Sequence, residues 1–123
     1  MIKLKNNIED LLDSLSKSKF RGSFHLNKKM KNYVKEKGFD KIKSDARDLI
    51  TKRIAPGNPN NDGKQTPMRQ VPVFIAQHAT GCCCRGCLEK IHGIKKGHEL
   101  SNEEIDYVVN TLMLWIQREM SKD

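Results

Sequence analysis

Long apolar runs are absent from this sequence: none of its stretches approaches the roughly 18 residues that a membrane-crossing helix needs. Residues 1–7 carry charge but no apolar segment, so we expect no signal peptide and a cytoplasmic protein. Aromatic residues are scarce, at 6% of the chain, and hydrophobic residues make up 37%, which is enough for one modest core. The length of 123 residues fits one compact domain and leaves little room for a second.

Acidic side chains are in the minority in the N-terminal half. Residues 1–53 contain 15 basic and 7 acidic side chains and so carry a formal charge of +8, whereas residues 101–123 contain 2 basic and 5 acidic ones. A polyanion such as nucleic acid is therefore expected to meet the N-terminal half. The alternative is a lysine-rich surface that is simply solvated, since lysines are mostly exposed in any protein.

The spacing of apolar residues predicts a mainly α protein of about five helices in one compact domain. Three helices are predicted where a capping or helix-favouring residue precedes an apolar face, and they begin near Asn6 or Asn7, at Asn27 and at Asp40. The last helix starts with the capping box Ser101-Asn102-Glu103-Glu104 and extends to about Met120. No segment alternates strongly enough to require a sheet.

Two shorter segments are less regular. The apolar run after Pro72 fits a short helix, because proline suits a first helical turn, but its pattern fits a buried strand as well. Residues 83–91 are expected to form a short helix, or a turn followed by a helix, that stops at Gly93.

Residues 55–71 are predicted to form a long ordered loop. Prolines and glycines interrupt this segment throughout, so that neither helix nor strand can run through it. Loops of this length in a compact domain are usually functional or disordered, and we favour a functional one. Lys64 and its neighbours offer polar groups for an anion or a substrate, although the pattern of a P-loop is missing.

All four cysteines lie within six positions, at Cys82, Cys83, Cys84 and Cys87. A framework of structural disulfides is dismissed, because such bonds join cysteines that are separated along the chain and form in oxidising compartments. In a reducing cytosol, clustered cysteine and histidine residues indicate metal binding or thiol chemistry instead.

The spacing within this segment predicts a metal site. Cys84 and Cys87 form a C-x-x-C motif, which can bring two thiolates to one tetrahedral ion. His92 precedes the helix stop at Gly93, and His78 lies before the turn at Gly81. The predicted ligands, which are all soft sulfur or nitrogen donors suited to zinc, are His78, Cys84, Cys87 and His92, with Cys83 as the substitute.

Two other function classes stay open. The first is an enzyme that binds its substrate under the loop of residues 55–71. It would use the thiolate of Cys84 or Cys87, or the metal as a Lewis acid, with His78 or His92 as the base and Lys64 as a further candidate. The basic neighbours Arg85 and Lys90 would favour a thiolate there. The second is an interaction module without a metal, in which the cysteines are simply buried.

Four motifs in a fixed order resemble a family of small, mostly bacterial proteins that is catalogued only as a domain of unknown function. The motifs are Gly63-Lys64-Gln65-Thr66-Pro67, the segment from Pro72 to Thr80, the segment from Cys83 to Lys90, and His92-Gly93-Ile94. The resemblance covers the chain from about Ser16 onward and implies no known activity. It makes residues 16–121 a family-like core and residues 1–15 an N-terminal helical extension.

The resemblance also bears on the cysteines. It implies a shared cluster of His78, Cys83, Cys84, Cys87 and His92. Three positions depart from the family pattern, since Val71 stands where a histidine is expected, Cys82 where a threonine is, and Ile91 where a tryptophan is. Cys82 is therefore expected to be incidental to the site, and position 71 is not expected to contribute a ligand.

Overall fold

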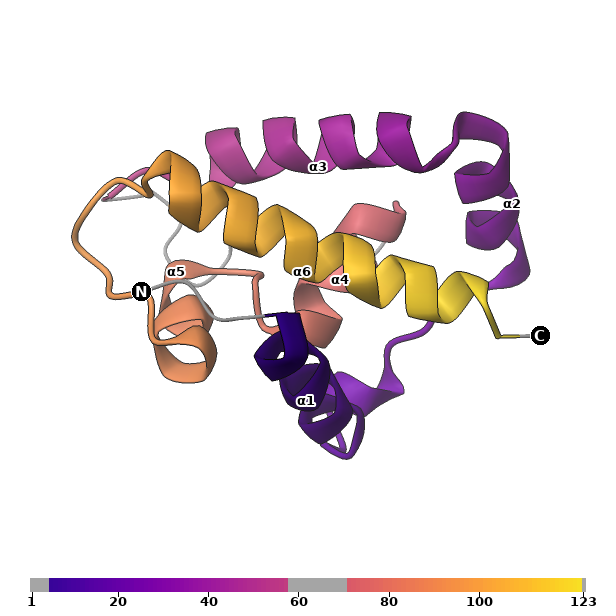
Figure 1. Ribbon diagram of the computed structural model, residues 1–123, viewed down its shortest axis with the longest axis horizontal. Helices are drawn as coiled ribbons and strands as arrows, with labels where there is room; N and C mark the ends of the chain where they lie inside the picture. Colours follow the sequence, from indigo (N-terminus) through magenta and orange to yellow (C-terminus); the bar gives the residue numbers. More distant parts are fainter. Residues whose placement is uncertain (1–4, 58–70, 123) are drawn as a thin grey trace.

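The computed structural model describes residues 5–57 and 71–122 and is built from helices (Figure 1). The longer helices are α1 (Lys5–Ser16), α2 (Lys28–Lys37), α3 (Phe39–Arg53), α4 (Pro72–Thr80) and α6 (Asn102–Met120). The shorter elements are the 3₁₀ turn η1 (Arg21–Ser23), the single turn α5 (Arg85–Cys87) and the π-helical turn η2 (Leu88–His92) that continues it. Within the described ranges there is no strand, and the prediction of a mainly α protein with about five helices is confirmed.

The predicted starts of α2 and α6 are found where the sequence places them. Helix α1 instead begins at Lys5, so that Asn6 and Asn7 lie inside it, and α3 begins at Phe39, one residue before Asp40. The side chain of Asn27 accepts the backbone N–H of Met30 and so caps α2. At the start of α6 both bonds of the capping box form, because Ser101 accepts the N–H of Glu104 while the Glu104 carboxylate accepts the N–H of Ser101.

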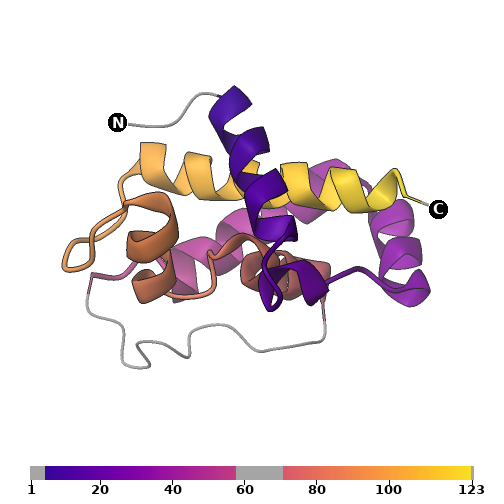
Figure 2. The same ribbon diagram turned by 90° about the horizontal axis from the view of Figure 1, so that it is seen from below.

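Helix α4 occupies the centre of the molecule. It packs against α1, α2, α3, α6 and η1, and all nine of its residues are buried. Figures 1 and 2 show α3 and α6 side by side, with α4 close to both. Because α4 has no solvated face, its sequence carries no helical periodicity, and this is why the pattern alone left helix and strand open.

The loop predicted for residues 55–71 is described only at its ends. Residues 58–70, which include Lys64, lie outside the described residues, so their predicted order and function stay predictions. At the near end, the carbonyl of Ala55 accepts the N–H of Leu100 at 2.9 Å, which ties the end of α3 to the segment before α6.

No helix in the described part of the chain combines the length and the apolar character that a membrane crossing requires.

Candidate metal centre

A tight turn leads the chain from α4 into the cysteines. Gly81 ends α4 with a φ of 75°, in the left-handed region that favours glycine. A Cβ atom on Gly81 would also clash with Cδ1 of Ile91, so η2 packs directly against this turn. The cysteines therefore lie in a short segment that is fixed by α4 at one end and by η2 at the other.

Three sulfur atoms gather in this turn. The Sγ atoms of Cys83, Cys84 and Cys87 all lie within 4.8 Å of one another, and those of Cys83 and Cys87 are 3.6 Å apart. Cys84 has an extended backbone just before α5, and its Sγ accepts the N–H of Cys87 at 3.3 Å, which draws the two residues together. Cys83 and Cys84 are buried and Cys87 is half-buried. This group of three, the thiol cluster, could hold a metal ion.

A guanidinium group lies against the thiol cluster. Arg21 of η1 donates from Nη2 to the Sγ of Cys87 at 3.3 Å and from Nη1 to the Sγ of Cys83 at 3.6 Å. Nη1 also donates to the carbonyl oxygen of His78 at 2.6 Å, which fixes the side chain against the end of α4. Burial acts to lower the pKa of Arg21, but the hydrogen bonds to the two sulfurs outweigh it and raise the pKa. Two of the three sulfurs thus face a permanent positive charge.

The third sulfur has a different environment. Burial raises the pKa of the Cys84 thiol, and the backbone N–H groups of Cys87 and Gly86 offset only part of this effect. Cys84 is therefore a neutral thiol near pH 7, and a metal ion that binds it must displace its proton.

His92 belongs to a separate buried network. Its Nε2 donates a hydrogen bond to the carbonyl oxygen of Thr80 at 2.7 Å. Nδ1 is therefore the unprotonated nitrogen, and it accepts a hydrogen bond from the hydroxyl of Tyr107 at 2.8 Å. Burial lowers the pKa of His92 and raises that of Tyr107 to about 12, so both are neutral near pH 7. The imidazole joins the end of α4 to α6, and neither nitrogen is directed to the thiol cluster.

Cys82 contacts this network rather than the other sulfurs. Its Sγ lies 3.6 Å from Nε2 of His92 and 3.9 Å from the carbonyl oxygen of Thr80. Burial raises the pKa of Cys82 to about 12, so it stays a thiol. It takes no part in the group of sulfurs, as the family resemblance implied.

We expect Tyr107→Phe to destabilise the fold by about 1–3 kcal/mol, because Nδ1 of His92 then stays buried without its donor. Urea unfolding followed by circular dichroism measures this change. Tyr33→Phe is the matched control: Tyr33 is 37% exposed, and the expected change is below about 0.5 kcal/mol. Equal effects of the two substitutions would show that the hydroxyl of Tyr107 contributes nothing specific.

His78 lies near the thiol cluster without joining it. Its ring is buried in the last turn of α4 and stacks on Phe24, with the ring centroids 5.5 Å apart. Of the predicted ligands, the structure thus brings together Cys84 and Cys87, with the substitute Cys83 as their third member, and places the two histidines outside this group. The predicted four-ligand set stays a prediction.

Arg85 has a structural position that its sequence neighbours do not indicate. Although it stands between cysteines, its guanidinium is 1% exposed and points to backbone carbonyls. Nη1 and Nη2 donate to oxygens on two separate segments, which are those of Ile54, Ala55, Pro56, Lys95 and His98. Arg85 therefore holds the end of α3 to the segment before α6, and Arg21 is the arginine that contacts the sulfurs.

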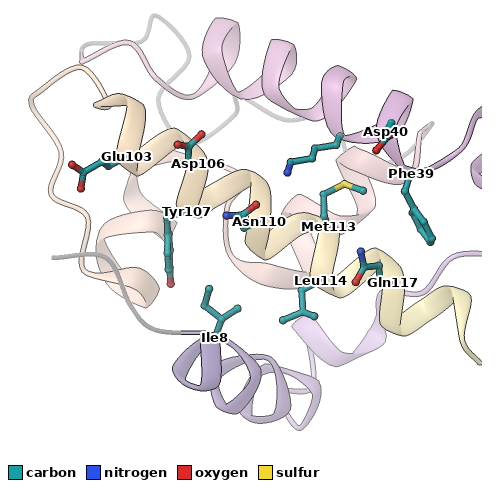
Figure 3. Close-up of a pocket in the computed structure, with 11 residues that line it drawn as sticks. Ile8, Phe39, Asp40, Glu103, Asp106, Tyr107, Asn110, Met113, Leu114 and Gln117 are labelled. Carbon is teal, nitrogen blue, oxygen red and sulfur yellow. The ribbon is translucent and has the colours of Figure 1, made fainter.

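The structure also contains a surface groove of about 620 Å³ between α1, α3 and α6 (Figure 3). Its lining combines apolar side chains such as Ile8 and Met113 with the polar groups of Asn110 and Tyr107, and it includes no cysteine. Figure 3 shows the side chain of Tyr107 projecting from α6, and its hydroxyl bonds to Nδ1 of His92 in η2. The groove and the thiol cluster are therefore separate features of the molecule.

The basic surface predicted to meet a polyanion includes α2. Four lysines of this helix are exposed, at Lys28, Lys29, Lys35 and Lys37, and Lys31 is half-buried. Among the described residues, none of them forms an ion pair; Lys31 donates to the carbonyl of Lys122, and the ammonium of Lys37 lies over the ring of Tyr33. Contact with nucleic acid stays a prediction.

The fold and the thiol cluster together define an all-helical protein with a cysteine site that could hold a metal. Residues 9–117 match the model of a family described as Domain of unknown function (DUF4186), and the chain belongs to this family. The resemblance seen in the sequence is thereby confirmed. No solved structure matches the chain significantly.

Proposed function

We propose that this protein binds one zinc ion through the thiolates of Cys83, Cys84 and Cys87, and that the ion stabilises the fold. The observation that carries the proposal is the separation of the three sulfurs, all within 4.8 Å of one another in a single turn. Sulfur ligands grouped in this way suit a soft, tetrahedral ion, and zinc is the usual choice among such ions.

The charge around the thiol cluster supports this proposal. Three thiolates around a divalent ion leave a net charge of minus one, which is costly to bury without compensation. The guanidinium of Arg21 supplies the opposite charge, with hydrogen bonds to two of the three sulfurs. Donation of an N–H to a charged sulfur is also stronger than donation to a neutral one.

A structural role follows from where the three residues lie. They stand between α4 and η2, and Arg21 connects them to η1. An ion bound here would fix the relative positions of these elements around the central helix. A tetrahedral ion has a fourth position, and His78, on the neighbouring turn of α4, is the ligand that the sequence predicts for it.

Elemental analysis of protein purified without a metal-affinity tag tests the proposal, with about one equivalent of zinc expected. Substitution by cobalt(II) should give the intense sulfur-to-metal absorption of a thiolate site. The Cys84→Ser variant should lose both signals, whereas Cys82→Ser should keep them. Less than about a tenth of an equivalent, together with thiols at Cys83, Cys84 and Cys87 that react with Ellman's reagent, would overturn the proposal.

A further inference from the structure

The Sγ atoms of Cys83 and Cys87 are close enough to react with each other. They are 3.6 Å apart and come from residues four positions apart, so a small movement of the side chains brings them to bonding distance. The Sγ of Cys84 lies within 4.8 Å of both sulfurs and accepts the N–H of Cys87. From this geometry we propose that Cys83 and Cys87 form a reversible disulfide when a peroxide reaches the thiol cluster.

Exposure distinguishes the roles of the two sulfurs. Cys83 is 8% exposed, whereas Cys87 is half-buried, so a small oxidant reaches Cys87 first. Nη2 of Arg21 donates to the Sγ of Cys87 at 3.3 Å, which places a positive charge beside this sulfur. Cys87 is therefore the sulfur that attacks, and Cys83 the one that resolves the product.

The chemistry is balanced with peroxide as the only oxidant. The thiolate of Cys87 attacks one peroxide oxygen, the O–O bond breaks, and the leaving hydroxide takes up a proton to give water and a sulfenic acid. The sulfur of Cys83 then attacks the sulfur of Cys87, and the S–O bond breaks. The hydroxide leaves with the proton of Cys83 as a second water, so the two thiols supply both electrons.

The proposal goes beyond the zinc site and needs no metal, although the two share sulfurs. A zinc ion held by all three thiolates would lose two of its ligands when the disulfide forms. It would also protect the sulfurs, so protein treated with a chelator should react faster than protein as purified. If the two rates are equal and the same disulfide forms, the zinc proposal is contradicted and the disulfide proposal stands.

Peptide mapping provides a direct test, because Arg85 lies between the two cysteines. Trypsin cleaves after Arg85 and separates the peptide of residues 70–85 from the peptide of residues 86–90. After brief treatment with hydrogen peroxide and blocking of free thiols, we expect the two peptides to stay joined and to separate on reduction. Fragment ions of the joined wild-type peptides should place the bond on Cys83.

Variants complete the experiment. The joined peptides should disappear in Cys83→Ser and persist in Cys82→Ser and Cys84→Ser. Arg21→Gln should slow the reaction about tenfold, because it removes the positive charge beside the attacking sulfur, whereas Arg47→Gln, a remote control, should not change the rate. Absence of joined peptides in the wild type, or fragment ions that place the bond on Cys82 or Cys84, would overturn the proposal.

Discussion

Replacement of Arg85 by methionine is expected to lower the free energy of unfolding by more than about 3 kcal/mol. The shortest hydrogen bonds of this guanidinium are those to the carbonyls of Lys95 and His98, at 2.9 Å each, and of Pro56, at 3.1 Å. Methionine fills a similar volume but donates nothing, so these carbonyls lose their donor beside a side chain that is itself buried. Each unsatisfied buried group costs about 1–3 kcal/mol.

Two matched variants show whether this effect is specific. Arg85→Lys keeps the charge, but one ammonium with three donors replaces a two-nitrogen fork that contacts five carbonyls, so it should recover less than half of the lost stability. Arg47→Met removes an arginine whose only ion pair within the described residues, with Asp106, is exposed, and it should cost less than about 1 kcal/mol.

Chemical denaturation in the presence of a chelator measures all three variants without any contribution from a bound metal. The interpretation of Arg85 as a buried link between two segments would be wrong if Arg85→Met unfolded within 1 kcal/mol of the wild type.

The features that the sequence predicted correctly are the local ones. A capping box or a cap residue such as Asn27 involves partners three residues apart, and helical spacing brings together residues three or four apart. The closeness of Cys84 and Cys87 is of the same kind, because a C-x-x-C turn places both sulfurs on one side. These contacts depend on backbone geometry alone and can be read from spacing.

The contacts that the sequence did not reveal depend on packing between distant segments. Arg21 reaches the sulfur of Cys87 from 66 positions away, and nothing in its neighbourhood distinguishes it from the other basic residues. Arg85 donates to backbone carbonyls. Because every residue has a carbonyl, the sequence does not indicate which ones it contacts. In both cases the partner is fixed only once α4 is surrounded by the other elements.

The position of His92 could have been inferred in part. A tyrosine on the buried face of a predicted helix needs a partner for its hydroxyl, and Tyr107 lies on that face of α6. This signal indicates that a buried acceptor exists, although it does not say which residue supplies it. The ring of His92 is that acceptor, and its tautomer follows from the carbonyl of Thr80 on its other side.

Replacement of Cys87 by serine is expected to abolish zinc binding and to lower the melting temperature by roughly 15 °C. The substitution removes the sulfur that lies 3.6 Å from that of Cys83 and that accepts a hydrogen bond from the guanidinium of Arg21. An ion present at a thousand times its dissociation constant stabilises the fold by about 4 kcal/mol, and the variant loses this contribution. Thermal melts followed by circular dichroism, each with and without a chelator, measure the change.

The comparison with chelator separates the loss of the metal from the loss of the side chain itself. The wild type should melt near the temperature of Cys87→Ser once the chelator is added, whereas the variant should not respond to the chelator, because the stability that it lacks is that of the ion. Cys82→Ser should respond as the wild type does, since Cys82 contacts His92 and not the thiol cluster. A Cys87→Ser protein that melts with the wild type, both with and without the chelator, would contradict a structural metal at this site.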